Sequence, residues 1–537
     1  MSGHQHSGEE EAARWPLLTG DHLDSEGEEV LFDQRISGES REGAGKALTY
    51  EEAVEQTGLG LFHWLLLLVC GWANASDTVE ILCVSFLLPT ARCDLQLSSS
   101  DMGLLTASIF LGMMVGGYIW GYLADQRGRR RVLVVSLTVN GLFGGLSSIA
   151  PWFWLFLLLR FISGVGVGGS IPVIFSYFSE FMPRVKRGAM ISALATFWMG
   201  GNILAAGLAW LVIPRTWAHV SLGTLDFQSW RLFVVFCSVP SITSAVIFKL
   251  LMPESPKFLL EAGRENEAIR VFRLMFELNM KKSGKTFLEF GLCPSSRLRE
   301  ELEEVQASPG QNLPFILKQS LEPIKHMFRG HLRLRSIALL IIFYCISFGY
   351  YGLWMWFPEL FARAEDGGSP CANMPLPSPL QNQSCYPVKT AVYKESFIIA
   401  ACNLPGNVFT MLFMDITGGR KLLSTSLMAS SLSVFLIYVV QTKTQSLGLS
   451  CIFSGVSVIS WNALDVVGTE LYPTRLRSSA LGFFSGVGRV AAIMGNVVFG
   501  KLVDTNCFVP ILLVSILLLT GGLVALLLPQ TRQTELT

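Results

Sequence analysis

Charged residues are scarce in this sequence, and their scarcity argues against an ordinary soluble protein. Only 15% of the 537 residues are Asp, Glu, Lys or Arg, whereas about 25% is usual in soluble domains. Hydrophobic residues make up 51% of the chain, and the mean hydropathy is +0.46. We therefore expect a protein whose main partner is the lipid bilayer, with no nucleic acid partner.

Motifs that mark enzymes and cofactor sites are missing as well. The sequence contains no zinc-type His/Cys cluster, no G-x-S-x-G elbow and no phosphate loop, so we expect no enzyme, no metal and no cofactor. The G-x-G-x-x-G spacing of a dinucleotide-binding motif occurs at Gly164, Gly166 and Gly169, but these glycines lie inside a long apolar run. We interpret this run as membrane helix, in which Gly164 and Gly168 allow close helix approach and Pro172 adds a local break.

Apolar runs of about 20 residues recur along the chain, each long enough to cross about 30 Å of hydrocarbon. Twelve such runs predict an all-α membrane protein. The first six lie near residues 61-90, 104-125, 131-150, 153-179, 189-213 and 231-251. The second six lie near 335-360, 393-415, 421-440, 446-469, 479-503 and 507-529.

The distribution of basic residues predicts how these spans are oriented, because Lys and Arg prefer short cytoplasmic loops. The loops after spans 1, 3, 9 and 11 hold only Arg92 and Lys443. The loops after spans 2, 4, 8 and 10 hold eleven basic residues: Arg127, Arg129, Arg130, Arg131, Arg184, Lys186, Arg187, Arg420, Lys421, Arg475 and Arg477. Both termini and the middle loop are therefore expected in the cytoplasm.

The regions outside the spans have distinct compositions. Residues 1-50 carry eleven acidic and four basic side chains, which predicts a disordered cytoplasmic tail that offers a site for trafficking partners, and no cleavable signal peptide. Thr49 and Glu52 spell a capping box, so a short helix is expected before span 1. The other predicted regions are a six-helix bundle over 51-251, amphipathic middle-loop helices over 252-334, a second bundle over 335-529 with a lumenal loop at 361-392, and a tail at 530-537.

An internal repeat relates the two bundles. Asp125 precedes Gly128 by three residues, and Asp415 precedes Gly418 in the same way, 290 positions later. The acidic-Pro-basic turn that starts at Glu180 recurs at Glu470, again after 290 positions. This shared register predicts the major facilitator fold, with two pseudo-symmetric six-helix halves.

The repeated signatures are candidates for gating. In each signature an acidic residue is followed by glycine or proline and then by arginine. These charges can pair with neighbouring helix ends and close the cytoplasmic side reversibly. Alternatively, they serve only to anchor the helices at the lipid headgroups. The candidate gating residues are Asp125, Arg129, Glu180, Arg187, Asp415, Arg420, Glu470 and Arg477.

Charged residues inside the spans are candidates for solute binding or proton coupling, since each is costly in hydrocarbon unless it is paired or faces water. Asp77 and Glu80 lie three residues apart on one helix face. They either face a cavity and couple proton movement or are hydrogen-bonded to neighbouring helices. Asp465 and Arg489 are predicted to form a buried ion pair, and Arg160 is expected either within span 4 or reaching the lumenal surface.

Aromatic and amide side chains lie near these charges in the sequence. Trp198, Tyr350, Tyr351, Trp461 and Asn462 are candidate cavity residues, because rings with a few polar groups suit a small, partly apolar or sugar-like solute. Alternatively, each aromatic ring contributes to ordinary helix packing or lies at the membrane–water interface without contacting a solute.

The chain resembles the synaptic vesicle glycoprotein 2 family, which is near the synaptic vesicle 2-related proteins and organic ion transporters of the major facilitator superfamily. The resemblance rests on motifs that include "LGMMVGGYIWGYLADQRGRR", "SGVGVGGSIPVIFSYFSEF", "SFGYYGLWMWFPEL" and "SWNALDVVGTELYP". It implies a vesicle membrane protein with a transporter fold. By motif, Asp77 and Glu80 match the family's acidic pair, and Arg489 matches its basic residue. The matching central-cavity positions are Trp198, Trp461, Asn462 and Asp465.

The sequence departs from the family mainly on the lumenal side. Family members carry a long domain between spans 7 and 8, but only residues 361-392 occupy that place here. Cys371 and Cys385 lie in this loop and are candidates for a disulfide, and Asn382 begins a glycosylation sequon.

Two functions are compatible with these observations. The first is a secondary transporter of a small organic solute, an organic ion or a sugar-like molecule, which works by alternating access with possible proton coupling. The second is a non-transporting protein of the synaptic or secretory vesicle membrane that binds a ligand and regulates vesicle trafficking or exocytosis.

Overall fold

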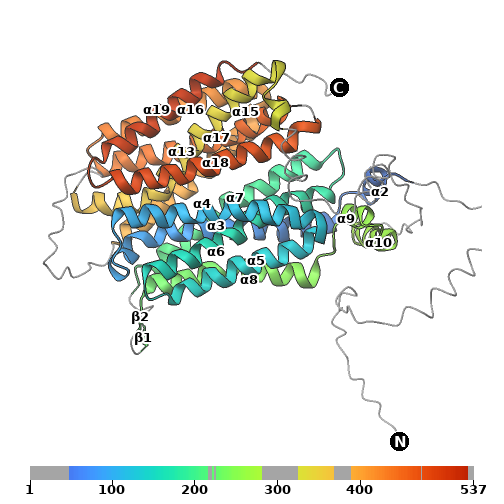
Figure 1. Cartoon of the computed structure of the whole chain (residues 1–537), viewed down its shortest axis with the longest axis horizontal. Coiled ribbons are helices and arrows are strands. Elements are labelled where there is room, and N and C mark those ends of the chain that lie inside the picture. Colours follow the sequence, from blue (N-terminus) through green and yellow to red (C-terminus); the bar gives the residue numbers. More distant parts are fainter. Residues whose placement is uncertain are drawn as a thin grey trace, which may run out of the picture.

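Two groups of six long helices lie side by side in the protein (Figure 1). The computed structural model describes residues 48–215, 220–222, 225–280, 324–367, 389–472 and 474–529. Within these residues, twelve helices are long and apolar enough to cross a membrane, which confirms the twelve predicted spans. The first half contains α3 (Leu61–Asp94), α4 (Ser99–Arg127), α5 (Arg129–Leu146), α6 (Phe153–Glu180), α7 (Arg187–Val212) and α8 (Ser229–Leu251).

The second half repeats this arrangement. It contains α13 (Arg333–Gly367), α14 (Thr390–Ala401), α15 (Asn403–Thr417), α16 (Gly419–Val439), α17 (Lys443–Glu470), α18 (Thr474–Leu502) and α19 (Phe508–Ala525). Span 8 is divided into α14 and α15 at Cys402, because Pro405 has no N–H to donate to the preceding turn.

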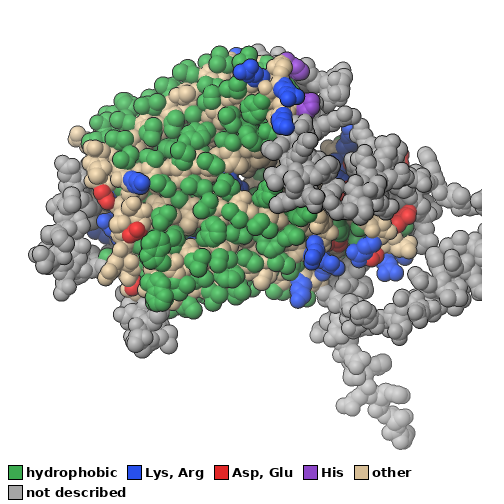
Figure 2. All heavy atoms as spheres, viewed as in Figure 1, with side chains coloured by type: hydrophobic (Ala, Val, Ile, Leu, Met, Phe, Trp, Pro, Cys, Tyr) green, Lys and Arg blue, Asp and Glu red, His purple; other side chains and the backbone are tan. Residues whose placement is uncertain are grey.

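The outer surface of the bundle is suited to lipid. Large apolar side chains such as Leu158, Ile416 and Ile516 are exposed on it. Figure 2 shows hydrophobic side chains across the middle of one face, with charged side chains gathered toward its two ends. This distribution matches a hydrocarbon layer bounded by two polar interfaces.

The two ends of the bundle carry different short elements. At one end, here called the hairpin end, strands β1 (Val220–Leu222) and β2 (Leu225–Phe227) pair in antiparallel register between α7 and α8. At the other, here called the α10 end, lie α2 (Tyr50–Gln56), α9 (Pro256–Glu261) and α10 (Glu265–Met280) (Figure 1). The predicted capping box at α2 is confirmed, since Thr49 and Glu52 cap each other's backbone N–H groups.

Helix α10 is tied to the start of α3. The Asn279 side chain accepts a hydrogen bond from the Phe62 N–H at 3.0 Å and donates to the Thr57 carbonyl at 2.9 Å. On its apolar face, α10 buries Val271 and Phe272. Helix α10, which lies in the predicted middle loop, therefore has a buried apolar face.

The glycine-rich stretch of α6 is membrane helix, as the sequence predicted. A methyl group built on Gly168 would lie 2.5 Å from the Cα of Met113 in α4, and one on Gly166 would lie 2.6 Å from the backbone nitrogen of Asn140 in α5. Glycine is needed at both positions because two neighbouring helices approach α6 this closely. The predicted break at Pro172 is wrong, since α6 continues through it to Glu180.

Backbone contacts join the two halves at the hairpin end. A methyl group built on Gly103 of α4 would lie 2.8 Å from the Cα of Gly500 in α18. Nearby, the Ser85 hydroxyl of α3 donates a hydrogen bond to the Met355 carbonyl of α13 at 2.7 Å. The halves are therefore packed directly against each other at this end.

A substitution at Gly103 tests this contact. We expect Gly103→Val to destabilise the protein by about 1–3 kcal/mol, because the added side chain must push α4 away from α18. Thermal unfolding of the purified protein in detergent measures the effect. Gly121→Val is the matched control on the same helix, because a methyl group built on Gly121 meets no atom within 4 Å. Equal losses in the two variants would contradict the contact.

Candidate functional site

Asp77 lies in the middle of α3 and is fully buried. Its carboxylate accepts hydrogen bonds from the Ser170 hydroxyl of α6 at 2.6 Å and from the Asn140 amide of α5 at 3.2 Å. Asn140 also donates to the Ser241 hydroxyl of α8 at 3.1 Å. Asp77 therefore faces the interior of the first half rather than the second half.

Glu80, one turn further along α3, forms an ion pair with Arg160 of α6. Its carboxylate also accepts a hydrogen bond from the Ser163 hydroxyl at 3.0 Å, and Arg160 donates to the Cys83 sulfur at 3.1 Å. The Arg160 side chain is 0% exposed, so the alternative in which it reaches the lumenal surface is wrong. The Glu80 carboxylate supplies a partner inside the bundle, and the guanidinium therefore does not need to reach water.

The hydrogen-bonding groups of the Glu80–Arg160 pair are only partly satisfied. Within the described residues, Glu80 Oε2 and Arg160 Nε have no hydrogen-bond partner. The site is also tightly enclosed, because a methyl group built on Gly144 of α5 would lie 2.2 Å from Glu80 Oε1. A carboxylate in such a place can be neutralised either by its arginine or by a proton, which is the chemistry that coupling requires.

Four aromatic side chains form a cluster on α13 and α17, and it lies against the first half. Tyr350 stacks on Trp354 with ring centroids 5.2 Å apart, and Tyr351 lies 5.7 Å from Trp461. Tyr351 also packs against Phe110 of α4, with centroids 5.1 Å apart. The structure brings together three residues predicted for the cavity, Tyr350, Tyr351 and Trp461, and adds Trp354, which sequence reasoning missed.

The predicted ion pair between Asp465 and Arg489 is absent within the described part of the chain. Asp465 is exposed and lies one turn after Trp461 on α17. Arg489 is half-buried, and its Nη1 atom is buried without a hydrogen-bond partner among the described residues. Asp465 and Arg489 are thus not neutralised by each other.

Asn462 lies in a chain of hydrogen bonds that crosses between the halves. Its amide donates to the Asn407 carbonyl oxygen of α15 at 2.9 Å, and Asn407 donates to the Thr196 hydroxyl of α7 at 3.3 Å. Sequence reasoning missed Asn407, although its place in a polar "PGN" turn of span 8 was a usable signal. Trp198, on the same helix as Thr196, is half-buried and packs against the core.

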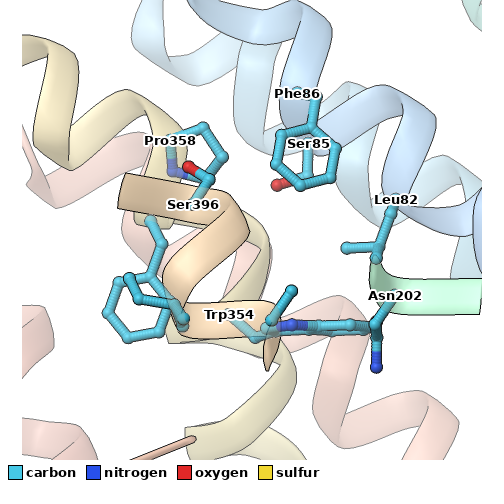
Figure 3. A pocket seen from close by; sticks show the side chains of 10 residues that line it. Leu82, Ser85, Phe86, Asn202, Trp354, Pro358 and Ser396 are labelled. Atoms are coloured by element: carbon cyan, nitrogen blue, oxygen red, sulfur yellow. The ribbon is translucent and has the colours of Figure 1, made fainter. Parts of the chain in front are cut away.

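A small pocket lies between the halves beside the aromatic cluster (Figure 3). Its walls come from α3, α7, α13 and α14, and they include Ser85, Asn202, Trp354 and Ser396. Asn202 is buried, and neither atom of its side-chain amide has a hydrogen-bond partner among the described residues. An amide in this state can bind water or a polar group that enters the pocket.

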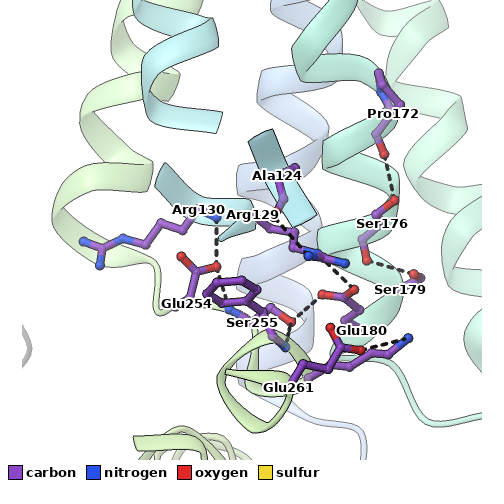
Figure 4. A network of polar contacts seen from close by, with 12 residues as sticks. Ala124, Arg129, Arg130, Pro172, Ser176, Ser179, Glu180, Glu254, Ser255 and Glu261 are labelled. Atoms are coloured by element: carbon purple, nitrogen blue, oxygen red, sulfur yellow. Dashed lines mark hydrogen bonds and ion pairs between the residues drawn. The ribbon is translucent and has the colours of Figure 1, made fainter. Parts of the chain in front are cut away.

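At the α10 end, the gating signature of the first half forms a network (Figure 4). Arg129 and Glu180 form an ion pair at 3.3 Å, and Glu180 also accepts a hydrogen bond from Ser255, the N-cap of α9. The neighbouring Glu254 carboxylate accepts from the Arg130 backbone N–H at 2.9 Å. The two predicted signatures thus meet, and together they hold the middle loop against the first half.

Arg187 pairs with a helix outside the spans. Its guanidinium donates to both carboxylate oxygens of Glu51 in α2 at 3.1 Å. In the same helix, the Tyr50 hydroxyl donates to the Glu180 carbonyl. Burial raises the pKa of Tyr50 well above its usual value, and the Glu180 and Glu51 charges add to this effect. Tyr50 therefore remains a neutral hydrogen-bond donor at physiological pH.

The corresponding signature of the second half is described only in part. The side chains of Asp125, Asp415 and Arg477 lie outside the described residues. Glu470 is exposed, while Arg420 is half-buried with its Nε atom lacking a partner among the described residues.

A second ionic network closes the hairpin end, and sequence reasoning missed it. Arg92 of α3 pairs with Glu359 of α13 at 3.1 Å, and Glu359 also pairs with Arg363 at 2.9 Å. Arg363 in turn pairs with Asp504 at 2.8 Å and donates to the Ser99 hydroxyl of α4 at 2.9 Å. Two of these contacts, to Arg92 and to Ser99, cross between the halves.

Asp504 is outside the spans, and its surroundings favour the ionised form. Burial alone would raise the pKa of Asp504, but hydrogen bonds from Ser99 and Arg363 outweigh it and lower that pKa. Ionised Asp504 therefore contributes stability above the ordinary aspartate pKa of about 4, and the contribution is lost as the pH falls through the lowered value.

Two cysteines at the hairpin end, Cys93 and Cys507, are disulfide-bonded. Sequence reasoning assigned neither to a disulfide. The predicted disulfide cysteines Cys371 and Cys385, and the predicted glycosylation site Asn382, lie outside the described residues, as do residues 1–47 of the acidic tail.

Comparisons with known proteins agree with this architecture. The sequence model of the Major Facilitator Superfamily matches residues 66–375. Human synaptic vesicle glycoprotein 2B is 32% identical, and the alignment covers 98% of this chain and 91% of that protein. The chain belongs to the synaptic vesicle glycoprotein 2 family of the Major Facilitator Superfamily. Rat synaptic vesicle glycoprotein 2A, another family member, is also 32% identical over 90% of this chain and 79% of its own length.

Solved structures show the same fold. The inward open xylose transporter XylE from E. coli superposes with a TM-score of 0.62 at 17% identity, covering 88% of this chain and 98% of the transporter. Its partially occluded inward open form gives a TM-score of 0.61 at 16% identity, covering 86% and 98% of the two chains. This family member is thus a multi-pass membrane protein with a transporter fold.

The buried Glu80–Arg160 pair predicts a non-additive pair of substitutions. Glu80→Met or Arg160→Met alone should cost about 3–5 kcal/mol, because each leaves one buried charge without its partner. The double variant should be more stable than either single variant, since it buries no charge at this place. Thermal unfolding of the four proteins measures the cycle, and additive losses would show that the two side chains are not coupled.

Proposed function

We propose that this protein is a secondary transporter that moves a small organic solute by alternating access between its two halves. The observation that carries the proposal is the uncompensated pair of charges beside the aromatic cluster. Arg489 retains a buried nitrogen without a partner among the described residues, and Asp465 is exposed one turn after Trp461 of the cluster. Charges left in this state inside a membrane protein favour a site that a charged or polar solute completes.

The chemistry of the site favours an organic ion, a zwitterion or a sugar-like solute. The rings of Tyr350, Trp354 and Trp461 offer flat apolar faces, whereas Arg489 offers N–H donors and Asp465 offers carboxylate acceptors. The guanidinium matches a carboxylate or a hydroxyl pair on the solute. Asn202 of α7, in the first half, adds a side-chain amide whose oxygen and nitrogen both lack a hydrogen-bond partner among the described residues.

Contacts between the halves support alternating access. At the hairpin end, the Arg92–Glu359 ion pair and the Arg363–Ser99 hydrogen bond join the halves. At the α10 end, the Arg129–Glu180 pair lies within the first half. This asymmetry fits a solute path that is closed toward the hairpin end, with the repeated gating signatures acting at the other end.

Proton coupling is assigned to the acids of α3. Glu80 is held by Arg160 and Asp77 by Ser170 and Asn140, so a proton taken up by either carboxylate breaks contacts that join α3 to α5 and α6. These contacts lie within the first half, which favours a role in moving α3 over direct contact with the solute.

The membrane in which the protein resides is inferred from its relatives, and its orientation there is inferred from the basic residues in its loops. The matched relatives are named as synaptic vesicle glycoproteins, which favours a synaptic or secretory vesicle membrane for this chain. The eleven basic residues counted in the loops after spans 2, 4, 8 and 10 favour a cytoplasmic position for the α10 end. The same names favour the second candidate, a non-transporting membrane protein that binds a ligand and regulates vesicle trafficking.

Uptake into proteoliposomes tests solute transport. The probes are a labelled hexose, a neutral amino acid, tetraethylammonium and p-aminohippurate, each measured by counterflow against the unlabelled compound. We expect at least one probe to accumulate, and we expect Arg489→Gln to reduce that uptake at least about tenfold because the guanidinium completes the site. Lys501→Gln, an exposed lysine on the same helix, is the matched control and should leave uptake unchanged.

Two other results have defined meanings. If no probe moves but one raises the thermal unfolding temperature through the Arg489 site, the ligand-binding regulator is the correct function. If Arg489→Gln transports as well as the unsubstituted protein, the assigned solute site is wrong.

A pH gradient tests coupling. We expect an inward proton gradient to stimulate uptake, and we expect the Asp77→Asn, Glu80→Gln double variant to lose this stimulation while it still exchanges solute by counterflow. The reason is that neither substituted side chain can take up a proton. Stimulation that persists in the double variant would assign coupling to other groups.

A further inference from the structure

We propose that Asp77 and Glu80 bind a single proton between them, and that either acid can hold it without movement of the side chains around it. Ser163, Ser170 and Asn140 make this possible, because they lie at hydrogen-bonding distance from the two carboxylates. The inference deepens the proposed proton coupling and rests on it for its role in transport. The bound proton itself can be measured in a protein that is not transporting.

The buried charges around the two acids do not balance without a proton. Asp77 and Arg160 are 0% exposed, and Glu80 is 1% exposed. Glu80 pairs with Arg160, whereas Asp77 forms no ion pair with any described residue. Two carboxylates and one guanidinium leave one negative charge, and a net charge buried in a lipid-immersed bundle is costly. One bound proton removes this charge, and a second proton would leave a positive charge in its place.

The described helices of the first half bring no further charge to the level of these acids. In α4 to α8, every charged residue except Arg160 is within three residues of a helix end. The other charged residues of α3 are Arg92 and Asp94, close to its end. Helix α13 packs against α3 from the second half, and its Glu359 is already paired with Arg92 and Arg363 at the hairpin end. The compensating proton is therefore assigned to the acids themselves.

Ser170 of α6 allows Asp77 to hold the proton. Its hydroxyl oxygen lies 2.6 Å from Asp77 Oδ2 and 3.1 Å from the Val167 carbonyl of its own helix. When Asp77 carries the proton, it donates to Ser170, and the Ser170 hydroxyl donates to Val167. When Asp77 is ionised, the Ser170 hydroxyl turns and donates to the carboxylate instead.

Ser163, two turns earlier on α6, has the same relation to Glu80. Its hydroxyl oxygen lies 3.0 Å from Glu80 Oε1 and 3.1 Å from Asn140 Oδ1. A hydroxyl has one hydrogen, so it donates to only one of these oxygens at a time. When Glu80 carries the proton, it donates to Ser163, which then donates to Asn140. When Glu80 is ionised, Ser163 donates to it, and Arg160 neutralises its charge.

Asn140 of α5 connects the two acids. Its amide nitrogen donates to Asp77 Oδ1 at 3.2 Å and to the Ser241 hydroxyl at 3.1 Å, which uses both of its hydrogens. Its amide oxygen faces Ser163 and can only accept. A continuous series of hydrogen bonds therefore runs from Asp77 through Asn140 and Ser163 to Glu80. The two arrangements differ only in the orientation of two hydroxyl groups and in which carboxyl group is protonated.

A shared proton limits the stoichiometry of the proposed coupling. Although α3 carries two buried acids, the neutral cluster holds one proton, so we expect at most one proton to move in each transport cycle. Ser163, Ser170 and Asn140 are positioning residues in this scheme, because they act through the two carboxyl groups and not on the solute.

Infrared spectroscopy of the purified full-length protein at neutral pH tests the shared proton, because a protonated carboxyl group has a carbonyl stretching band that an ionised carboxylate lacks. We expect Asp77→Asn and Glu80→Gln each to lose the intensity of one such band, since either substitution leaves one acid whose charge Arg160 balances. The double variant should lose no more than either single variant. Asp504→Asn, which removes an ionised aspartate outside the spans, is the control and should lose none.

Three results would overturn the proposal. A double variant that loses twice the intensity would show that each acid has its own proton. A loss in only one of the single variants would assign the proton to one acid alone, and unchanged intensity in all variants would show that no proton is bound.

Isotopic labelling covers the case in which the variants do not fold. The carboxyl groups of aspartate or of glutamate are labelled in the unsubstituted protein, so that the band of a labelled group moves to lower frequency. We expect each label to move part of the protonated-carboxyl intensity. Intensity that moves with only one of the two labels would contradict the sharing of the proton.

A substitution at Ser163 tests the connection between the acids. We expect Ser163→Ala to shift part of the band to higher frequency, because a protonated Glu80 without its serine acceptor forms a weaker hydrogen bond. Ser136→Ala is the matched control, since Ser136 lies one turn before Asn140 on α5 and donates to the Leu133 carbonyl of its own helix. An unshifted band in Ser163→Ala would contradict the role of this serine.

These measurements separate the shared proton from the proposed function. If no solute is transported but the band behaves as expected, the shared proton stands and its role in coupling is wrong. If a proton gradient stimulates uptake but the double variant loses twice the intensity of a single variant, coupling stands and the sharing is wrong.

Discussion

A charge buried in a lipid-immersed bundle must be neutralised within the bundle, and this requirement organises the polar contacts of the protein. Glu80 is matched by Arg160 inside the first half, and Glu359 is matched by Arg92 and Arg363 where the halves meet. Each pair fixes the position of one helix against another, since moving either helix would expose an unpaired charge to a medium of low dielectric. Arg489 and Asp465 differ from these pairs, because the two are not matched to each other and Arg489 Nη1 has no hydrogen-bond partner among the described residues. The polar interior therefore separates into charges that are paired with each other and charges that are not.

The two halves use this chemistry differently although they are related by a repeat. The first half has a fully buried polar core, in which Asp77, Asn140, Ser170 and Ser241 connect four helices. The second half instead places its aromatic cluster against the first half, where Tyr351 packs on Phe110. A movement of one half against the other would leave the buried core of the first half intact, because none of its hydrogen bonds crosses the seam. Such a movement would change the surroundings of Tyr351 and Asn407, whose contacts do cross it.

Sequence reasoning predicts the spans and the halves well, because hydrocarbon thickness and duplication leave signals in composition and register. It places Tyr350, Tyr351 and Trp461 together for the same reason, since the repeat fixes which helices line the seam. It cannot predict that Glu80 selects Arg160, because that choice depends on the rotation of α6 about its axis relative to α3, which the spacing of apolar residues on an all-apolar helix does not specify. Proline illustrates the same limit: α6 continues through Pro172, whereas span 8 is interrupted close to Pro405. The difference lies in whether neighbouring helices compensate the lost hydrogen bond, and this is a property of packing.

The contact of Gly103 with Gly500 brings the backbones of the two halves together near one end of α4. No side chain separates the two backbones there, so the helix axes are at their closest and cannot approach further. From Gly103 to Arg127, the last residue of α4, the helix rises 1.5 Å per residue, or about 36 Å in total. A rigid rotation of about 10° at the glycine contact therefore displaces the far end of α4 by about 6 Å, at the fixed rise per residue of an α-helix. Under the proposed alternating access, a rotation that hardly alters the packing around the two glycines would therefore move the opposite end of the bundle by several ångströms.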